Sequence, residues 1–426
     1  MSSFSGYPAS LRYVFSRLAG YARNRSRMPV TSPVEATHGD TIVYEIGPNQ
    51  LVDLSTITFG FNCTTTADGG TNSHVPPSNT NCLVENLMIE VNGIPVQNTA
   101  NYHHVYDLYA KYHQGNDAEN KGKIGDWVSV YKNQNSVVLT NVPLVIRNML
   151  GFFASGKCID TGLTGPIRVS MRVADSKAMI TKGSPTSTTF KMTNMYISYD
   201  TISISDGIYN EMMQARLASG GMISIPFTNF TTYMGSLTNV DNAVNRIGVN
   251  CQSLDYILHT VIPEAYNGST SRVYDAETET SAFFNKGHLD IYGSQVQVGS
   301  VFLPNYRQQN ALEIFCHTTD SLNLTGDLLG GFASAFYPTV GAAALTSKSL
   351  TEIYTEKYFL HAIRLCHGND FEYGSRLISG LDCRGSSVQV SATTYSTSAG
   401  NVYPFTIILS TAQLNIAAHR QLQFVA

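Results

Sequence analysis

The sequence consists largely of short runs in which apolar and polar residues alternate, separated by loops rich in Gly, Asn, Ser and Thr. A period of two places successive side chains on opposite faces of a strand, so these runs predict antiparallel sheets with one buried face. Between residues 41 and 204 the runs are TIVYEI, LVDLSTITFGF, NLMIEV, SVVLTNVPLVI, IRVSMRV and TFKMTNMYISYDTISI. The predicted fold class is therefore all-β, with few short helices in loops.

A second set of alternating runs begins at residue 222. It comprises MISIPF, SLDYILHTVI, HLDIYG, ALEIFCHTT, KYFLHAIRLC, SVQVSATTY, VYPFTIILST and LQFVA. Between the two sets, residues 208–221 read as a short helix closed by glycines, which is typical of a domain boundary. The sequence predicts two β-domains at 35–207 and 222–426, a linker at 208–221 and a separate N-terminal segment at 1–34.

Three pairs of segments repeat in the same order, about 200 to 220 residues apart. LMIEVNGIPV (87–96) matches LDIYGSQV (289–296), VDLSTITF (52–59) matches SLDYILHT (253–260), and CIDTGLTGPIRVSMRV (158–173) matches GLDCRGSSVQVSATTY (380–395). In the first pair we align Gly93 with Gly293 as one turn, followed by Asn101-Tyr102 and Asn305-Tyr306. Ordered internal similarity of this length predicts two copies of one domain.

Composition limits what this chain does. Its 426 residues can bury two cores, and its charged fraction of 14% is well below the ~25% of typical soluble domains. With 24 Tyr and 19 Phe, it favours a surface covered largely by something other than water. The seven cysteines show no CxxC spacing, and an odd number favours a reducing compartment. No signal-peptide core or apolar run of 18 residues appears, so we expect a protein that is neither secreted nor membrane-spanning.

The segment 1–34 contains five arginines and no acidic residue. These are Arg12, Arg17, Arg23, Arg25 and Arg27. Ser10 can cap a short helix, after which the segment becomes loop-like. One interpretation is an arm that contacts anionic lipid or nucleic acid. The other is a tail that packs under a neighbouring subunit.

The clearest helix within the first domain is expected at 101–113. Its predicted apolar face consists of Val105, Leu108, Tyr109 and Tyr112. His103 and Asp107 lie four residues apart, a spacing that a metal ion could use, beside His104 and His113. A polar, solvent-exposed helix face is the stronger interpretation, so we predict no metal site.

The most acidic stretch contains Asp275, Glu277 and Glu279. A glycosidase needs two carboxylates aimed across a cleft, whereas these crowd one loop, which favours a solvated tip or a weak calcium site. The sequence contains neither a G-x-S-x-G elbow nor a phosphate-binding GK[ST] loop. We therefore predict no catalytic residue and no cofactor.

Two blocks resemble a known family. They are IEVNGIPV with NYHHVYDL (within 89–108) and LISGLDCRGSSVQVSATTYSTSAGNVYPFTIILSTAQLNI (377–416). Over about residues 35–426, the chain resembles the double jelly-roll major capsid proteins of icosahedral DNA viruses, the lineage of tectivirus, adenovirus, virophage and Polinton-like capsids. The resemblance rests on the layout of two tandem eight-stranded jelly-rolls, side by side.

The resemblance implies a structural protein of the virion, not an enzyme. Three copies would form a homotrimer whose six barrels give a pseudo-hexagonal outline, and such trimers would tile an icosahedral shell. Expected partners are the protein itself, neighbouring capsomers, penton and minor capsid proteins, and an internal membrane or the genome through the N-terminal arm. Assembly is expected inside the host cell. The loops 64–81, 265–286 and 328–350 are candidates for the exposed top of the trimer or for locks between subunits.

Two alternatives remain open at this point. The first is a carbohydrate-binding or carbohydrate-hydrolysing double β-sandwich, which requires a cleft with convergent carboxylates and aromatic platforms. The second is a single jelly-roll with an unrelated projection domain. Strand order separates the second alternative from the duplication, because unrelated strand orders would refute two copies of one domain.

Overall fold

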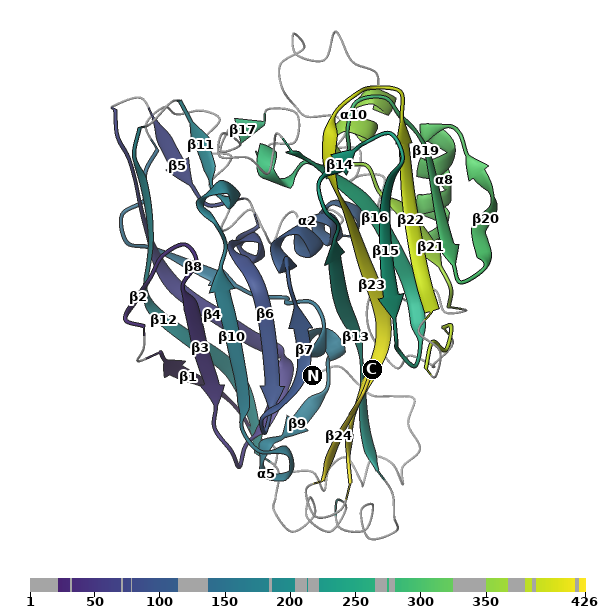
Figure 1. The fold of residues 1–426 in the computed structure, drawn as a ribbon. Coiled ribbons are helices and arrows are strands. Elements are labelled where there is room, and N and C mark those ends of the chain that lie inside the picture. The colour runs from purple at the N-terminus through teal and green to yellow at the C-terminus, as the bar shows by residue number, and fades with distance from the viewer. Residues whose placement is uncertain are drawn as a thin grey trace, which may run out of the picture.

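The chain folds into two barrels of antiparallel strands that stand side by side (Figure 1). In this computed structural model the described residues are 22–30, 33–69, 72–77, 79–113, 137–183, 186–203, 213, 222–264, 274–275, 280–324, 350–366, 380–384, 388–417 and 421–426. We call residues 22–203 the first barrel and residues 222–426 the second barrel. The predicted linker helix at 208–221, except residue 213, and the Gly/Ala-rich segment 328–347 lie outside the described residues.

The first barrel consists of two facing sheets. One has the order β1 (Ala22–Pro29), β12 (Thr188–Ser203), β4 (Leu51–Ala67) and β8 (Val142–Ile146), with β2 (Glu35–Ala36) on β12 and β9 (Cys158–Asp160) on β4. The other has the order β3 (Thr41–Ile46), β10 (Ile167–Val173), β6 (Val84–Val91) and β7 (Ile94–Thr99). In β10 the residues alternate between buried and more exposed, as a strand with one core-facing side requires.

The second barrel repeats this design. One sheet has the order β13 (Ile223–Met234), β23 (Asn401–Ile416), β16 (Leu254–Pro263) and β21 (His361–Arg364), with β14 (Thr238–Asn239) and β24 (Leu422–Val425) on β23. The other has the order β15 (Ala243–Val249), β22 (Val388–Ser396), β19 (Ile291–Val298) and β20 (Val301–Gln308). Every residue of β16 is buried, so this strand lies at the centre of the fold.

The two barrels share one strand order. When the eight main strands of each barrel are counted along the chain, one sheet reads 1-8-3-6 and the other reads 2-7-4-5 in both barrels. This is the antiparallel double-sheet arrangement of a jelly-roll. The prediction of an all-β chain with two copies of one jelly-roll is therefore confirmed, and the alternative of an unrelated second domain is wrong.

The matched segments fall on equivalent strands, but one alignment of turns is wrong. β6 and β19 are both fourth strands, as predicted. Gly93 lies with Asn92 in the tight turn after β6, where both residues have positive φ, as hairpin turns require. Gly293 instead lies inside β19 at a register shift, where a Cβ atom would come 2.9 Å from the Gln308 carbonyl oxygen. The second glycine is thus explained by close backbone approach rather than by a turn.

A helix follows the fifth strand in both barrels. α2 (Tyr102–His113) follows β7 as predicted, whereas α8 (Ala311–Ser321) occupies a segment that we predicted to be a strand. The Asn310 side chain accepts a hydrogen bond from the Leu312 N–H at 2.9 Å and so caps α8. Ile314 and Thr318 of α8 are fully buried at helical spacing. The short apolar run in ALEIFCHTT fits both the helical period of about 3.6 residues and the strand period of two. Asn310, a favourable helix-capping residue just before the run, was the sequence signal for a helix that we overlooked.

The remaining elements are short connections. They are β5 (Ser73–Val75) with β11 (Ile180–Lys182), β17 (Tyr274–Asp275) with β18 (Thr280–Ser281), α5 (Thr161–Thr164), α10 (Leu350–Lys357), and the 3-10 turns η1 (Thr80–Leu83), η3 (Phe152–Ser155), η4 (Ser176–Ala178) and η5 (Ala282–Phe284). β4 continues to Ala67, so the expected loop 64–81 begins later than predicted.

A stacked contact between Arg27 and Tyr196 stabilises the sheet of the first barrel that contains β1, β12 and β4. Tyr196 on β12 pairs with Gly60 on β4, and the guanidinium of Arg27 on β1 lies 3.6 Å from the centre of the Tyr196 ring. A Cβ atom on Gly60 would overlap the Tyr196 ring. Glycine at position 60 therefore leaves room for the Tyr196 ring of β12, which contacts β4 on one side and Arg27 of β1 on the other.

We expect Gly60→Ala to lower the free energy of unfolding by about 1–3 kcal/mol, because the ring must move away from its stacked position. Gly248→Ala is the matched control, since a Cβ atom there meets no other atom within 4 Å. Urea denaturation measures both. Equal stability of the two variants would contradict this account. So would an undiminished loss in the free energy of unfolding when Gly60→Ala is introduced into a Tyr196→Ala variant, which lacks the ring.

Candidate functional site

The predicted basic arm is partly built into the first barrel. Arg23, Arg25 and Arg27 lie on β1, which pairs along its length with β12. The Arg23 guanidinium contacts Asp200 at 2.6 Å and Asp53 at 3.0 Å, and Arg25 contacts Asp200 at 3.3 Å. The two aspartates face each other across the strands, so the arginines offset a repulsive carboxylate pair.

The other two predicted arginines, Arg12 and Arg17, lie outside the described residues. The first sheet thus begins before residue 35, where we had placed the start of the first domain. An interior-facing role for the five arginines stays a prediction, as do the other domain boundaries.

The two barrels meet along a seam between β7 and β13. The Thr99 hydroxyl donates to the Phe230 carbonyl at 3.0 Å, and the Thr232 hydroxyl donates to the Ala100 carbonyl at 2.7 Å. Phe152 and Phe227 pack edge to face beside them, with ring centroids 5.2 Å apart. We call this contact, together with α2, the barrel seam.

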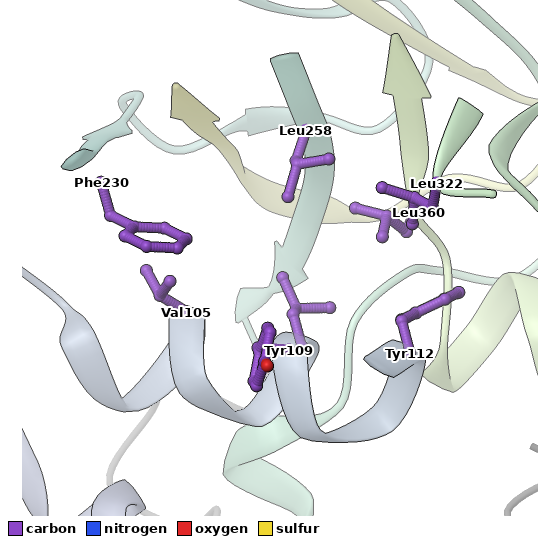
Figure 2. Close-up of a pocket in the computed structure, with 8 residues that line it drawn as sticks. Val105, Tyr109, Tyr112, Phe230, Leu258, Leu322 and Leu360 are labelled. Carbon is purple, nitrogen blue, oxygen red and sulfur yellow. The ribbon is translucent and has the colours of Figure 1, made fainter. Parts of the chain in front are cut away.

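Helix α2 lies within the seam and buries its predicted apolar face against the second barrel. Figure 2 shows Val105, Tyr109 and Tyr112 of α2 facing side chains of the second barrel. The cavity between them has a volume of about 10 Å³. The cavity is lined by Val105, Leu108, Tyr109, Tyr112, Phe230, Leu258, Leu322 and Leu360. The Tyr112 hydroxyl also donates to the Tyr358 carbonyl. The apolar face that we predicted is confirmed, and its partner is the second barrel.

The opposite face of α2 is also buried, which our expectation of surface histidines did not foresee. His103, His104 and Asp107 are each at most 5% exposed. The His104 ring packs against Phe283 at a centroid distance of 4.7 Å and edge to face against Phe405 at 5.9 Å. The end of the expected exposed loop 265–286 thus packs inside the chain.

Two lysines complete this polar cluster, which we call the seam cluster and which comprises His103, His104, Asp107, Lys111 and Lys286. The fully buried Lys286 ammonium lies 2.9 Å from His104 Nδ1 and donates to the Phe284 carbonyl at 3.1 Å. Lys111 pairs with Asp107 at 2.8 Å and donates to the same carbonyl at 3.1 Å. One carbonyl oxygen, that of Phe284, therefore accepts hydrogen bonds from two lysines at the seam.

Burial shifts the pKa values of Lys286 and of the two histidines in the seam cluster. It lowers the pKa of Lys286 to about 7; Asp107 opposes this shift and Lys111 adds to it. Burial and the Lys286 charge lower the pKa of His103 to about 3 and hold the pKa of His104 well below its usual range. The histidines are therefore neutral at physiological pH, and Lys286 is the group that titrates there.

We expect Lys286→Met to remove a pH dependence of stability. The folded-state pKa lies below the unfolded value, so the unfolded chain binds more protons between about pH 7 and 10.5, and wild-type stability rises with pH across this range. Relative to Lys286→Met, the rise is about 1.4 kcal/mol per pH unit. Urea denaturation at pH 7.5 and 9 measures the difference.

The exposed Lys191 on β12 offers the matched control, and Lys191→Met should retain the wild-type slope. Parallel pH profiles for wild type and Lys286→Met would show that Lys286 keeps an ordinary pKa, contrary to this account.

A group of side chains that could hold a metal ion is not found in the part of the chain that the structure describes. Within those residues, no three His, Cys, Asp or Glu side chains are grouped to hold a metal ion. Of the acidic stretch, Asp275 lies in β17, while Glu277 and Glu279 are outside the described residues. No described helix is long and apolar enough to cross a membrane.

Comparison with known proteins gives structural matches only. No protein-family model matches the sequence, and no curated protein matches it. The PBCV-1 protein VP54, fitted into a reconstruction of the virophage Sputnik, superposes with a TM-score of 0.57 at 11% identity, covering 95% of this chain and 97% of that chain. The Sputnik virophage structure gives 0.55 at 10% identity, covering 95% and 88%, and the Faustovirus major capsid protein gives 0.55 at 10%, covering 98% and 93%.

The chain has the double jelly-roll fold of viral major capsid proteins. This likeness spans almost the entire chain, so it includes both barrels and the seam between them. The predicted fold family is therefore confirmed, at sequence identities too low for sequence comparison to detect it.

The double jelly-roll leaves one apolar strand edge open. β20 is the fifth strand of the second barrel, as β7 is of the first, and within the described residues no strand pairs with its outer edge. Val301, Phe302 and Tyr306 on β20 and Leu312 on α8 are 44–57% exposed. We call these four residues the β20 patch. An open, apolar edge is a liability unless another chain covers it.

Proposed function

We propose that this chain is the major capsid protein of an icosahedral virus, a structural protein of the virion and not an enzyme. The double jelly-roll fold carries the proposal, since it spans nearly the whole chain and matches capsid components of PBCV-1 and Faustovirus. The composition agrees with this function, because a low charge and many aromatic residues suit a chain whose sides are buried against neighbours.

The assembly unit that we propose is a homotrimer with a pseudo-hexagonal outline of six barrels. Within one chain, the seam joins the fifth-strand edge of the first barrel to the first strand of the second barrel. Within the described residues the same two kinds of edge remain unpaired at the outer sides of the two barrels, as β20 with α8 in the second barrel and as β1 in the first. A second copy that docks its β1 side on the β20 patch repeats the seam between chains, and three such contacts close a ring.

We expect Phe302→Asp to convert the trimer to monomers, because a carboxylate would be desolvated in the interface. Leu289→Asp is the matched control, since Leu289 is 50% exposed but precedes β19, away from the open edge. Light scattering after size exclusion gives the molar mass. A monomeric wild type, or a trimeric Phe302→Asp variant, would count against this assembly unit.

The N-terminal arm is proposed to face the shell interior, toward a membrane or the genome. We expect deletion of residues 1–21, which leaves β1 in place, to preserve trimers but reduce shell assembly. Because Arg12 and Arg17 would act through charge, Arg12→Gln with Arg17→Gln should reproduce part of the loss. Electron microscopy counts the shells. Loss of the trimer on deletion would show that the arm is a subunit contact instead.

Further partners follow from this proposal. A closed shell needs penton and minor capsid proteins at positions that the trimers leave open, and the capsid is the location of the protein. Assembly is proposed to take place inside the host cell.

A further inference from the structure

The two barrels differ chemically at one equivalent junction. In the first barrel Ile159 pairs with Val52 at the start of β4. In the second barrel Leu381 pairs with Leu254 at the start of β16. An aspartate follows the apolar residue in both, and the next residue is Thr161 in the first barrel but Cys383 in the second.

In the first barrel hydrogen bonds close this junction. The Thr161 backbone N–H donates to the Gln50 carbonyl at 2.8 Å. The Thr161 hydroxyl lies 3.0 Å from the Gly47 and Gln50 carbonyls, and it accepts from the Gln50 N–H at 2.9 Å. One threonine therefore ties the segment before the seventh strand to the start of the third strand.

In the second barrel two cysteines occupy the junction. The Cys383 N–H donates to the Cys251 carbonyl at 2.9 Å, in place of the Thr161 contact. The exposed fractions of Cys251 and Cys383 are 5% and 1%, and both side chains belong to one apolar cluster that includes Leu254 and Val390. The side chains of Cys251 and Cys383 interact by hydrogen bonding, and the Cys383 thiol also donates to the Leu381 carbonyl at 3.6 Å.

We propose that Cys251 and Cys383 form a disulfide that locks the second barrel when the protein meets a peroxide. Both thiols are free in this structure. Their backbones are joined by a hydrogen bond of 2.9 Å and their side chains lie in one apolar cluster, which brings the two residues close enough in space for a disulfide. This inference extends to a covalent modification and does not depend on the proposed capsid function.

The reaction needs one small oxidant, hydrogen peroxide, and balances without any other. The Cys383 thiolate attacks one peroxide oxygen, the O–O bond breaks, and the released hydroxide takes a proton to become water. The Cys251 sulfur then attacks the sulfur of the resulting sulfenic acid and forms the S–S bond, while the S–O bond breaks and the departing hydroxide takes the Cys251 proton to become water. In total, two thiols and one peroxide give one disulfide and two water molecules.

The order of attack follows from the hydrogen bond between the thiols. Burial raises the pKa of both groups, that of Cys251 to about 12, while the bond donated by Cys251 lowers the pKa of Cys383. Cys383 therefore ionises first, and the reaction should be faster at pH 9 than at pH 7 because the thiolate is the nucleophile.

The test uses the purified full-length protein and hydrogen peroxide as the probe. After oxidation, free thiols are alkylated with N-ethylmaleimide in denaturant and counted by mass spectrometry. We expect seven adducts before oxidation and five after it, because one disulfide removes two of the seven thiols. Peptide mapping without reductant should recover residue 251 linked to residue 383, and dithiothreitol should reverse the link.

The control variants separate this pair from general oxidation. Cys63→Ala, at a buried cysteine of the first barrel, should still form the link, whereas Cys251→Ser and Cys383→Ser should not. Oxidised wild type should melt roughly 5 °C or more above its reduced form, and neither serine variant should show this shift. Because mapping is done on wild type, the test stands even if a variant fails to fold.

Three outcomes would overturn the proposal. The first is that all seven thiols remain alkylatable after oxidation of folded protein. The second is that residues 251 and 383 become sulfinic acids without a link. The third is that the recovered disulfide joins a different pair of cysteines.

Discussion

The rest of the structure depends on the burial of α2 between the two barrels. An amphipathic helix normally keeps one polar face in water, but both faces of α2 are covered, one by apolar side chains of the second barrel and the other by η5 and Lys286. One continuous apolar core therefore runs through both barrels. Each barrel therefore buries apolar side chains against the other at the seam.

Polar groups make the seam specific as well as stable. Lys286 loses its hydration on burial and recovers hydrogen bonds only if His104 and the Phe284 carbonyl are in place. A shifted docking of the barrels would separate Lys286 from His104, so the buried side chain would lose its hydrogen bond across the seam at a cost in free energy. The seam cluster thus fixes one relative position of the barrels, and the open edges at β1 and β20 take their geometry from it.

The equivalence of strands in the two barrels could be predicted because repeated sequence marks equivalent strands. The match between residues 158–173 and 380–395 is correct even at the level of single pairs, since Ile159 and Leu381 both contact the start of the third strand. The seam cluster could not be predicted, because Lys286 and His104 are 182 residues apart and helical periodicity does not reveal what covers a polar face. The proximity of Cys251 and Cys383 could not be predicted either, because their spacing in the sequence carries no information on pairing.

Single-particle electron microscopy of the purified full-length protein tests the central claim most directly. The account predicts three chains in a ring, with six barrels in a pseudo-hexagonal outline and with contacts between chains that resemble the seam within each chain. Density for single chains whose β20 edge faces solvent would contradict it. So would two-fold dimers in which the β20 edges pair with each other.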